Sequence, residues 1–162
     1  MSAPTWEEPL PTLTGRAWAF GIELRVVDLL SQRYAMLAPE AASAHVLRDL
    51  DTALASRIGP GDVVSVEDLR GTSGAPQAFA ALRHLGVRAL VACRYDDGLE
   101  EAALAARLVP VALDAPAFIH TGDRLRIDLE AAKIVNLSSG DRAAIRNLDD
   151  ARRAALRGLF RT

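Results

Sequence analysis

The 162-residue sequence has a single cysteine, few aromatic side chains and no excess of positive charge. Because Cys93 is alone, the chain cannot form an intrachain disulfide. It also lacks the thiolates that a zinc knuckle or an iron–sulfur cluster would need from one polypeptide, and a reducing compartment is the simplest inference. The formal net charge of -2 argues against a nucleic-acid partner, since phosphate binding requires a positive surface.

Long hydrophobic runs and a basic leader are also missing. No apolar stretch approaches the roughly 20 residues that a membrane helix requires. The N-terminal segment has acidic residues and prolines where a secretory signal has a basic stretch and an apolar run. We therefore expect a cytoplasmic protein without a membrane partner. Half the residues are hydrophobic and a quarter are charged, which is typical of one folded domain; we assign it to residues 15–162, preceded by an N-terminal arm at 1–14.

Apolar periodicity predicts alternating strands and helices in the central half of the chain, which implies parallel strand pairing. Two antiparallel segments and a C-terminal helix follow. The expected strands are 15–20, 62–67, 88–95, 109–113 and two within 120–129 and 131–145; the expected helices are 46–58, one beginning at Pro76, 99–107 and 149–160. The fold class is thus α/β, with a partly parallel central sheet flanked by helices and a small antiparallel β appendage.

A glycine-rich loop, Gly71-Thr72-Ser73-Gly74, lies between an expected strand and the helix beginning at Pro76. Backbone N–H groups in such a loop, together with the helix dipole, attract anions. The simpler interpretation is that the loop turns the chain and caps the helix. Spacing alone favours capping, so the chemical interpretation needs further support.

That support comes from a series of short motifs spread along the chain. In order they are Gly15-Arg16, Trp18, Phe20-Gly21, Leu29-Leu30, Arg33-Tyr34, Pro60-Gly61-Asp62, Leu85-Gly86-Val87, Val109-Pro110-Val111, Thr121-Gly122-Asp123 and Asn136-Leu137. Together they resemble the small subunit of 3-isopropylmalate dehydratase, the swivelling domain of the aconitase family of hydro-lyases. The resemblance implies a swivelling β/β/α domain over residues 15–162.

The resemblance also implies a role for the loop at 71–74. Ser73 aligns with the serine that acts as catalytic base in the family. Ala75 stands where the family has a substrate-binding arginine, and Gln77 where it has a histidine. An Asp-Thr-Asp loop of the family is replaced by Arg25-Val26-Val27. Alanine cannot provide the two-point contact by which arginine binds a carboxylate, so these departures predict a substrate other than isopropylmalate, with fewer carboxylates.

By resemblance, the chain is a hydro-lyase small subunit that completes the active site of a large subunit carrying an iron–sulfur cluster. The expected reaction is dehydration or hydration of a small hydroxy acid, with the cluster iron binding the leaving hydroxyl. The substrate-binding candidates are Arg25, Arg33, Arg70, Gly71, Thr72 and Gly74, and no metal is expected on this chain. The alternative is a non-catalytic swivelling domain used for assembly, regulation or small-molecule binding.

The remaining conspicuous residues have simpler explanations. The three histidines show no metal-site spacing, so we expect His45, His84 and His120 to be structural or exposed. Cys93 lies in an apolar segment and is expected to be an inert core thiol. Trp6 and Trp18 are candidates for contacts with a partner, because tryptophan is favoured at interfaces.

Overall fold

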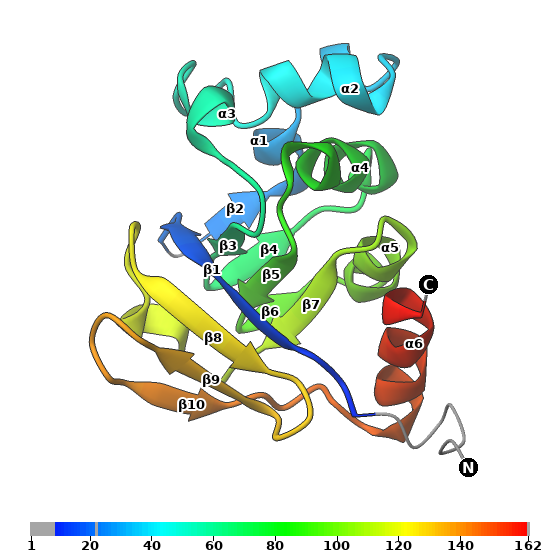
Figure 1. Cartoon of the computed structure of the whole chain (residues 1–162). Coiled ribbons are helices and arrows are strands. Elements are labelled where there is room, and N and C mark those ends of the chain that lie inside the picture. Colours follow the sequence, from blue (N-terminus) through cyan, green and yellow to red (C-terminus); the bar gives the residue numbers. More distant parts are fainter. Residues whose placement is uncertain (1–8, 22, 162) are drawn as a thin grey trace.

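The computed structural model describes residues 9–21 and 23–161 (Figure 1). The strands are β1 Thr12–Ala19, β2 Glu23–Arg25, β3 Val63–Ser65, β4 Asp68–Arg70, β5 Ala89–Ala92, β6 Arg94–Tyr95, β7 Val109–Ala112, β8 Arg124–Asp128, β9 Lys133–Asn136 and β10 Arg142–Ala144. The α-helices are α1 Val26–Leu29, α2 Pro39–Ala42, α3 Leu54–Arg57, α4 Ala75–Leu85, α5 Leu99–Ala105 and α6 Asp150–Phe160. Short 3-10 helices are η2 Gln32–Tyr34, η3 Ser43–His45 and η4 Pro116–Phe118. No helix within these residues is long and apolar enough to cross a bilayer.

In the described part of the chain, a seven-stranded sheet has the order β10-β9-β8-β1-β3-β5-β7. From β1 to β7 neighbouring strands are parallel, and from β1 to β10 they are antiparallel. The expected antiparallel strands therefore extend the same sheet through the β1–β8 pair, at the opposite end of the molecule from α1–α4 (Figure 1). The predicted α/β class with a partly parallel sheet is confirmed.

A second sheet of three short parallel strands has the order β2-β4-β6. Each of its strands follows a strand of the large sheet along the chain, after a bend at residues 20–21, 66–67 and 93. Backbone hydrogen bonds join the three bends: Phe20 N–H donates to Ser65 O, Glu67 N–H to Gly21 O, and Cys93 N–H to Glu67 O. β4 therefore lies beyond the strand expected at 62–67, and the strand expected at 88–95 is divided into β5 and β6; the bends account for both differences.

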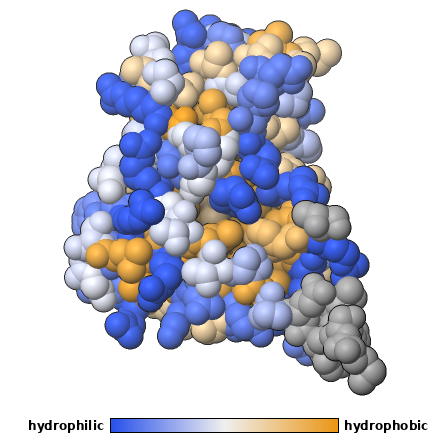
Figure 2. Space-filling view, in the orientation of Figure 1, coloured by the Kyte–Doolittle hydropathy of each residue, from blue (hydrophilic) through white to orange (hydrophobic). Residues whose placement is uncertain are grey.

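Two apolar clusters stabilise these layers. The first lies between the sheets and the helices and includes Phe79, Leu82 and Leu90. The second lies under the antiparallel strands and α6 and includes Ile127 and Leu156. In the view of Figure 2 the surface is mainly hydrophilic, and apolar side chains reach it chiefly between the helical end and the antiparallel strands. Burial of apolar surface is the main stabilising contribution in such a domain.

The helix predicted over 46–58 is wrong. Only Leu54–Arg57 is α-helical there, and the preceding residues form turns. Leu47 adopts a left-handed conformation with φ of 57°, and its N–H donates to Leu29 O at 2.8 Å instead of to a helical carbonyl. Val46, Leu47, Leu54 and Ile58 are nevertheless buried. The apolar spacing therefore indicated which of these side chains are buried, but it did not indicate a helix.

The N-terminal boundary also differs from the expectation. Residues 1–8 of the expected arm, including Trp6, lie outside the described residues. Leu10 is buried, and Thr12–Thr14 already pair with β8, so β1 begins three residues before Gly15. Residues beyond 10 therefore belong to the folded domain.

Two conspicuous side chains are placed differently from the prediction. Trp18 is only 7% exposed, and its Nε1 donates to the Asp62 carboxylate at 2.8 Å, so it belongs to the core and is unavailable to a partner. The same carboxylate accepts from Gly59 N–H and from the Arg16 guanidinium, which anchors the Pro-Gly-Asp turn. Cys93 is half-buried at the β5–β6 bend rather than in the core, with its Sγ 3.1 Å from Asp114 O.

Candidate functional site

The loop Gly71-Thr72-Ser73-Gly74 joins β4 to α4 and presents Ser73 to solvent. Gly74 is the N-cap of α4 with φ of 78°, and no side chain caps the helix. The loop therefore turns the chain and supplies the N-cap of α4 through Gly74, as the simpler interpretation has it, but without a capping hydroxyl. The Ser73 hydroxyl instead accepts a hydrogen bond from Gln32 Nε2 at 2.8 Å.

Ser73 borders a hollow of about 370 Å³ at the carboxyl ends of β2 and β4. These strands are parallel, with Arg25 opposite Arg70, so the segments that follow them emerge side by side. In open α/β sheets this edge is where ligands bind. Of the predicted site residues the hollow is lined by Arg25, Arg70, Gly71, Thr72 and Ser73.

Both arginines of this hollow are already paired with carboxylates. Arg25 Nη2 lies 3.2 Å from Asp28 Oδ1, and this hydrogen bond raises the pKa of the Arg25 guanidinium. Arg70 Nε lies 3.1 Å from Glu23 Oε1, and its Nη2 lies 3.4 Å from Asp68 Oδ2. Either arginine would have to exchange a partner within the chain to bind a substrate carboxylate.

Two other predicted site residues do not line the hollow. Arg33 pairs with Asp49 at 3.5 Å, and its guanidinium lies 4.9 Å from the centre of the Tyr34 ring. Gly74 contributes only the positive φ with which the loop enters α4. The Tyr34 ring in turn stacks on His45, at 3.9 Å between centroids, which gives that histidine the packing role expected of it.

The structure adds three residues to the site that the sequence analysis missed: Gln32, Glu23 and Asp96. Asp96 follows β6, and its Oδ2 accepts the N–H of Gly71 at 2.7 Å, which fixes the start of the loop. Gln32 and Ser73 are 41 residues apart, so no local pattern could have paired them. A usable signal existed for Asp96, because polar residues directly after parallel strands gather at one edge of a sheet.

A polar hollow of about 430 Å³ adjoins this edge and shares Arg70 with the first. Within it Arg94 Nε lies 2.9 Å from Asp68 Oδ1. The hydrogen bond from Arg94 lowers the pKa of the Asp68 carboxyl, so Asp68 is ionised at neutral pH. Acidic and basic side chains thus alternate along the site. Arg25 pairs with Asp28, and Arg70 pairs with both Glu23 and Asp68.

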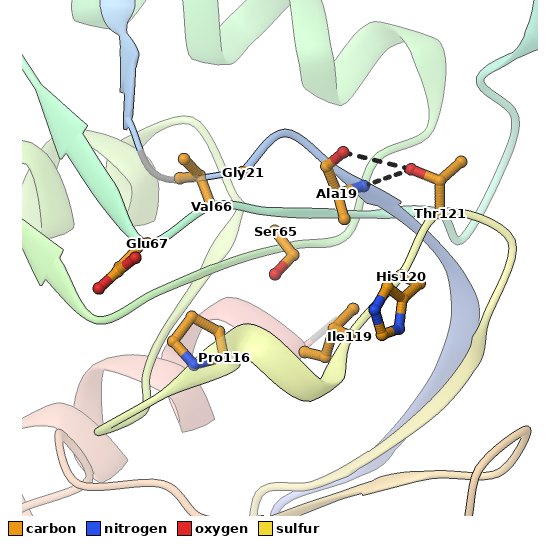
Figure 3. Close-up of a pocket in the computed structure, with 9 residues that line it drawn as sticks. All are labelled: Ala19, Gly21, Ser65, Val66, Glu67, Pro116, Ile119, His120 and Thr121. Carbon is orange, nitrogen blue, oxygen red and sulfur yellow. Dashed lines mark hydrogen bonds between the residues drawn. The ribbon is translucent and has the colours of Figure 1, made fainter.

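Another hollow, of about 370 Å³, lies at the bend between the two sheets (Figure 3). Ser65 points its hydroxyl into the space beside Pro116 and Ile119, while the Thr121 hydroxyl is bonded to the backbone of Ala19. Most of the lining is apolar, and the acidic side chain at its border is Glu67. A carboxylate there repels anions. The hollow at Ser73 also has a carboxylate, Glu23, but Arg25 and Arg70 line it as well, whereas no arginine is among the described residues that line the hollow at the bend. The loop at Ser73 is therefore the better candidate for a hydroxy-acid site.

No protein-family model matches the chain. Among curated proteins, a 3-isopropylmalate dehydratase small subunit 2 from Archaeoglobus fulgidus is 31% identical over 132 residues, which cover 79% of this chain and 79% of the relative. The 3-isopropylmalate dehydratase small subunit of Thermodesulfovibrio yellowstonii is 28% identical over 134 residues, covering 79% and 78%. The chain belongs to the family of 3-isopropylmalate dehydratase small subunits. The resemblance drawn from the sequence motifs is thereby confirmed.

The family includes more than one named activity. A methanogen homoaconitase small subunit from Methanothermobacter thermautotrophicus is 28% identical over 140 residues, covering 85% of this chain and 81% of the relative. A crystal structure of 3-isopropylmalate dehydratase from Methanocaldococcus jannaschii has the same fold, with a TM-score of 0.77 at 22% identity over 84% of this chain and 82% of that chain. The swivelling-domain architecture expected of this dehydratase small subunit is confirmed.

The described residues do not fit an iron–sulfur cluster on this chain. No three His, Cys, Asp or Glu side chains converge among them. The single cysteine, Cys93, has its Sγ directed to Asp114 O. Cluster ligation by thiolates requires several cysteines held together.

Proposed function

We propose that this dehydratase small subunit completes an active site on a large subunit of the aconitase family, for dehydration or hydration of a small hydroxy acid. The observation that carries the proposal is the exposed Ser73 hydroxyl, held by Gln32 at the edge of the hollow between β2 and β4. Names of relatives support the subunit role, since they are dehydratase and homoaconitase small subunits. The iron–sulfur cluster that the resemblance implies is assigned to the large subunit.

Ser73 is proposed as the base of this reaction. Its alkoxide takes the proton from the carbon next to a substrate carboxylate, and the electron pair of that C–H bond forms a double bond to the neighbouring carbon. The C–O bond of the neighbouring carbon breaks and its hydroxyl leaves as hydroxide, which together with the proton on Ser73 accounts for the water lost and restores the alkoxide. Because Gln32 Nε2 is a hydrogen-bond donor, it stabilises the alkoxide form of Ser73. Gly71 and Gly74 both have a positive φ, and Ser73 lies between them in the loop before α4. Its exposed hydroxyl is therefore in a position that a second polypeptide can cover.

The paired charges around the hollow affect how many carboxylates a substrate can carry. A substrate with two or three carboxylates needs unpaired arginines, whereas Arg25 and Arg70 are held by Asp28, Glu23 and Asp68. Position 75 carries a buried alanine in place of the family's arginine. These features support a hydroxy acid with fewer carboxylates than isopropylmalate.

The partner surface is proposed to extend from Ser73 over the segment after η2. Gln32 begins η2, and Met36 and Leu37, just beyond it, are 94% and 42% exposed. Exposed large apolar side chains beside a functional group are typical of an interface. A large subunit that closes over Ser73 would cover them.

Substitution Ser73→Ala in the complex with the co-expressed large subunit tests this role. Removing a catalytic base lowers kcat by about 100-fold or more and leaves KM nearly unchanged. Turnover is followed by the ultraviolet absorbance of the unsaturated acid, with citrate, 2-isopropylmalate and 3-hydroxybutyrate as probes carrying three, two and one carboxylates. The matched control is Ser56→Ala, which removes an exposed hydroxyl on α3 that donates a hydrogen bond to Ala53 O.

Unchanged turnover in Ser73→Ala would remove Ser73 as base and leave the assembly role. Gln32→Leu, which removes the donor to Ser73 Oγ, is expected to reduce kcat less than Ser73→Ala does. Equal loss in Ser56→Ala would show that the effect is not specific to the site.

A further inference from the structure

Three arginines converge at the end of the molecule where α4, α5 and α6 finish. Arg83 is in the last turn of α4, Arg88 precedes β5 and Arg107 follows α5. With Leu159 and Phe160 of α6 they line a hollow of about 270 Å³, here called the arginine hollow. It lies before the starts of β5 and β7, whereas the loop with Ser73 follows the end of β4. The two sites therefore lie at opposite edges of the parallel strands.

Within the described residues, none of the three guanidinium groups has a carboxylate within ion-pair distance. Arg107 Nη2 donates to Leu159 O at 2.7 Å, and Arg88 lies 5.9 Å from the centre of the Phe160 ring. Burial lowers the pKa of Arg83, and the charges of Arg88 and Arg107 lower it further. This contrasts with Arg25 and Arg70, whose charges are balanced within the chain.

Helix dipoles balance only part of this charge. The C-terminus of a helix is equivalent to roughly half a negative charge, so three helix ends provide about -1.5 against the three positive guanidinium groups. Roughly one and a half positive charges are left over in a partly buried hollow. Like charges that have no carboxylate partner among the described residues raise the energy of the folded state, and a bound anion lowers it.

The backbone at Arg107 gives independent support. Leu108 N–H donates to Ala103 O at 2.8 Å and Arg107 N–H to Leu104 O at 2.9 Å, which is the Schellman pattern that ends α5. The residue in its left-handed position is usually glycine, but here it is Arg107, with φ of 67°. Arg107 thus adopts a strained backbone conformation while its side chain lines the arginine hollow, and backbone strain of this kind gathers at functional sites.

We propose that the arginine hollow binds a small oxyanion carrying two or more negative charges, of the phosphate or polycarboxylate class. Planar guanidinium groups donate paired hydrogen bonds to such oxygens, and three of them converge from separate elements. The Phe160 ring adds an apolar side chain to the lining of the hollow. The site lies away from Ser73, so the inference does not depend on the proposed catalytic role.

Calorimetric titration of the full-length chain at fixed ionic strength tests the proposal, with inorganic phosphate and citrate as separate probes. At least one is expected to bind saturably with a Kd below about 1 mM, and the probe that binds more tightly identifies the class. The titration is repeated on the E7Q/E8Q double variant, so that the carboxylates preceding Pro9 cannot compete. Absence of saturable binding for both anions in both backgrounds would overturn the proposal.

Variants identify the site. Arg83→Gln, whose side chain makes no other bond among those described, and Arg107→Gly, which supplies the residue preferred at that φ, are each expected to weaken binding about tenfold or more. Their melting temperatures should stay near that of the parent chain, which separates lost binding from lost folding. Arg142→Gln, an exposed arginine on β10, and Ser73→Ala should leave the affinity unchanged. Equal weakening by Arg142→Gln would show a general charge effect and refute a site.

Discussion

At the scale of single residues, Gly86 shows how closely two turns approach each other. It follows α4 with φ of 102°, and a Cβ built there would lie 2.5 Å from Pro60 Cα. Gly61 N–H donates to Gly86 O at 2.8 Å, so the turn before β3 and the end of α4 are directly joined. Only glycine satisfies both the left-handed backbone and the missing space.

Substitution Gly86→Ala is therefore expected to destabilise the chain by about 3–5 kcal/mol, from backbone strain plus the contact with Pro60. Gly140→Ala is the matched control, because Gly140 also has a positive φ, of 85°, but open space around its Cβ position. It should cost only about 1 kcal/mol. Urea denaturation of both variants measures the difference, and equal losses would contradict the steric explanation.

At the scale of elements, a polar network of hydrogen bonds joins the end of β9 to the residue before β8. Asn136 is fully buried; its Nδ2 donates to Asp123 Oδ2 at 2.7 Å and to Phe118 O at 3.0 Å. The Asn136 Oδ1 accepts the N–H groups of Ser138 and Ser139. All the hydrogen-bonding capacity of the amide is used, as burial requires. The hydrogen bond from Asn136, followed by that from the His120 backbone, lowers the pKa of the Asp123 carboxyl.

This shift predicts a pH dependence of stability. The folded-state pKa of Asp123 is below its unfolded value of about 3.9, so its contribution is complete above that pH and is lost as the pH falls through the folded value. The free energy of unfolding of the parent chain should therefore fall more steeply than that of Asp123→Asn as the pH drops below about 4. Urea denaturation at each pH measures the two slopes, and parallel curves would assign the acid sensitivity to other carboxyls.

At the scale of the whole molecule, the central parallel strands hold the two apolar clusters together. Alternate residues of β1 and β3 enter different clusters: Trp18 and Val64 belong to the first, Ala17 and Val63 to the second. Neighbouring strands of the large sheet and the small sheet are also joined at the bends. Loss of packing in one cluster is thus transmitted to the other through the same strands.

Ile127→Ala, in the second cluster, is expected to destabilise the domain by about 2–5 kcal/mol while leaving a single unfolding transition. Trp18 reports from the first cluster, and Trp6→Phe removes the other tryptophan of the chain from the signal. Tryptophan fluorescence and far-ultraviolet circular dichroism should give coincident denaturation curves. Separated midpoints would show that the clusters unfold independently.

The sequence by itself determined the elements whose signals are local. Apolar periodicity after Pro76 located α4, and the helix expected over 149–160 is α6, with Asp149 as its N-cap. The same local information placed Ser73 between a strand and a helix, and the spacing of motifs indicated the family. These features depend on neighbours within a few residues, which a sequence pattern records directly.

Only the tertiary structure decided what distant residues do together. It bent β1, β3 and β5 into a second sheet, unwound the expected helix at 46–58, and paired Gln32 with Ser73 across 41 residues. It also paired Arg25 and Arg70 with carboxylates, while it gathered Arg83, Arg88 and Arg107 where none of the described carboxylates lies within ion-pair distance. Such contacts follow from strand order and from the packing of residues that are far apart in the sequence. A local sequence pattern does not record which distant segments pack together.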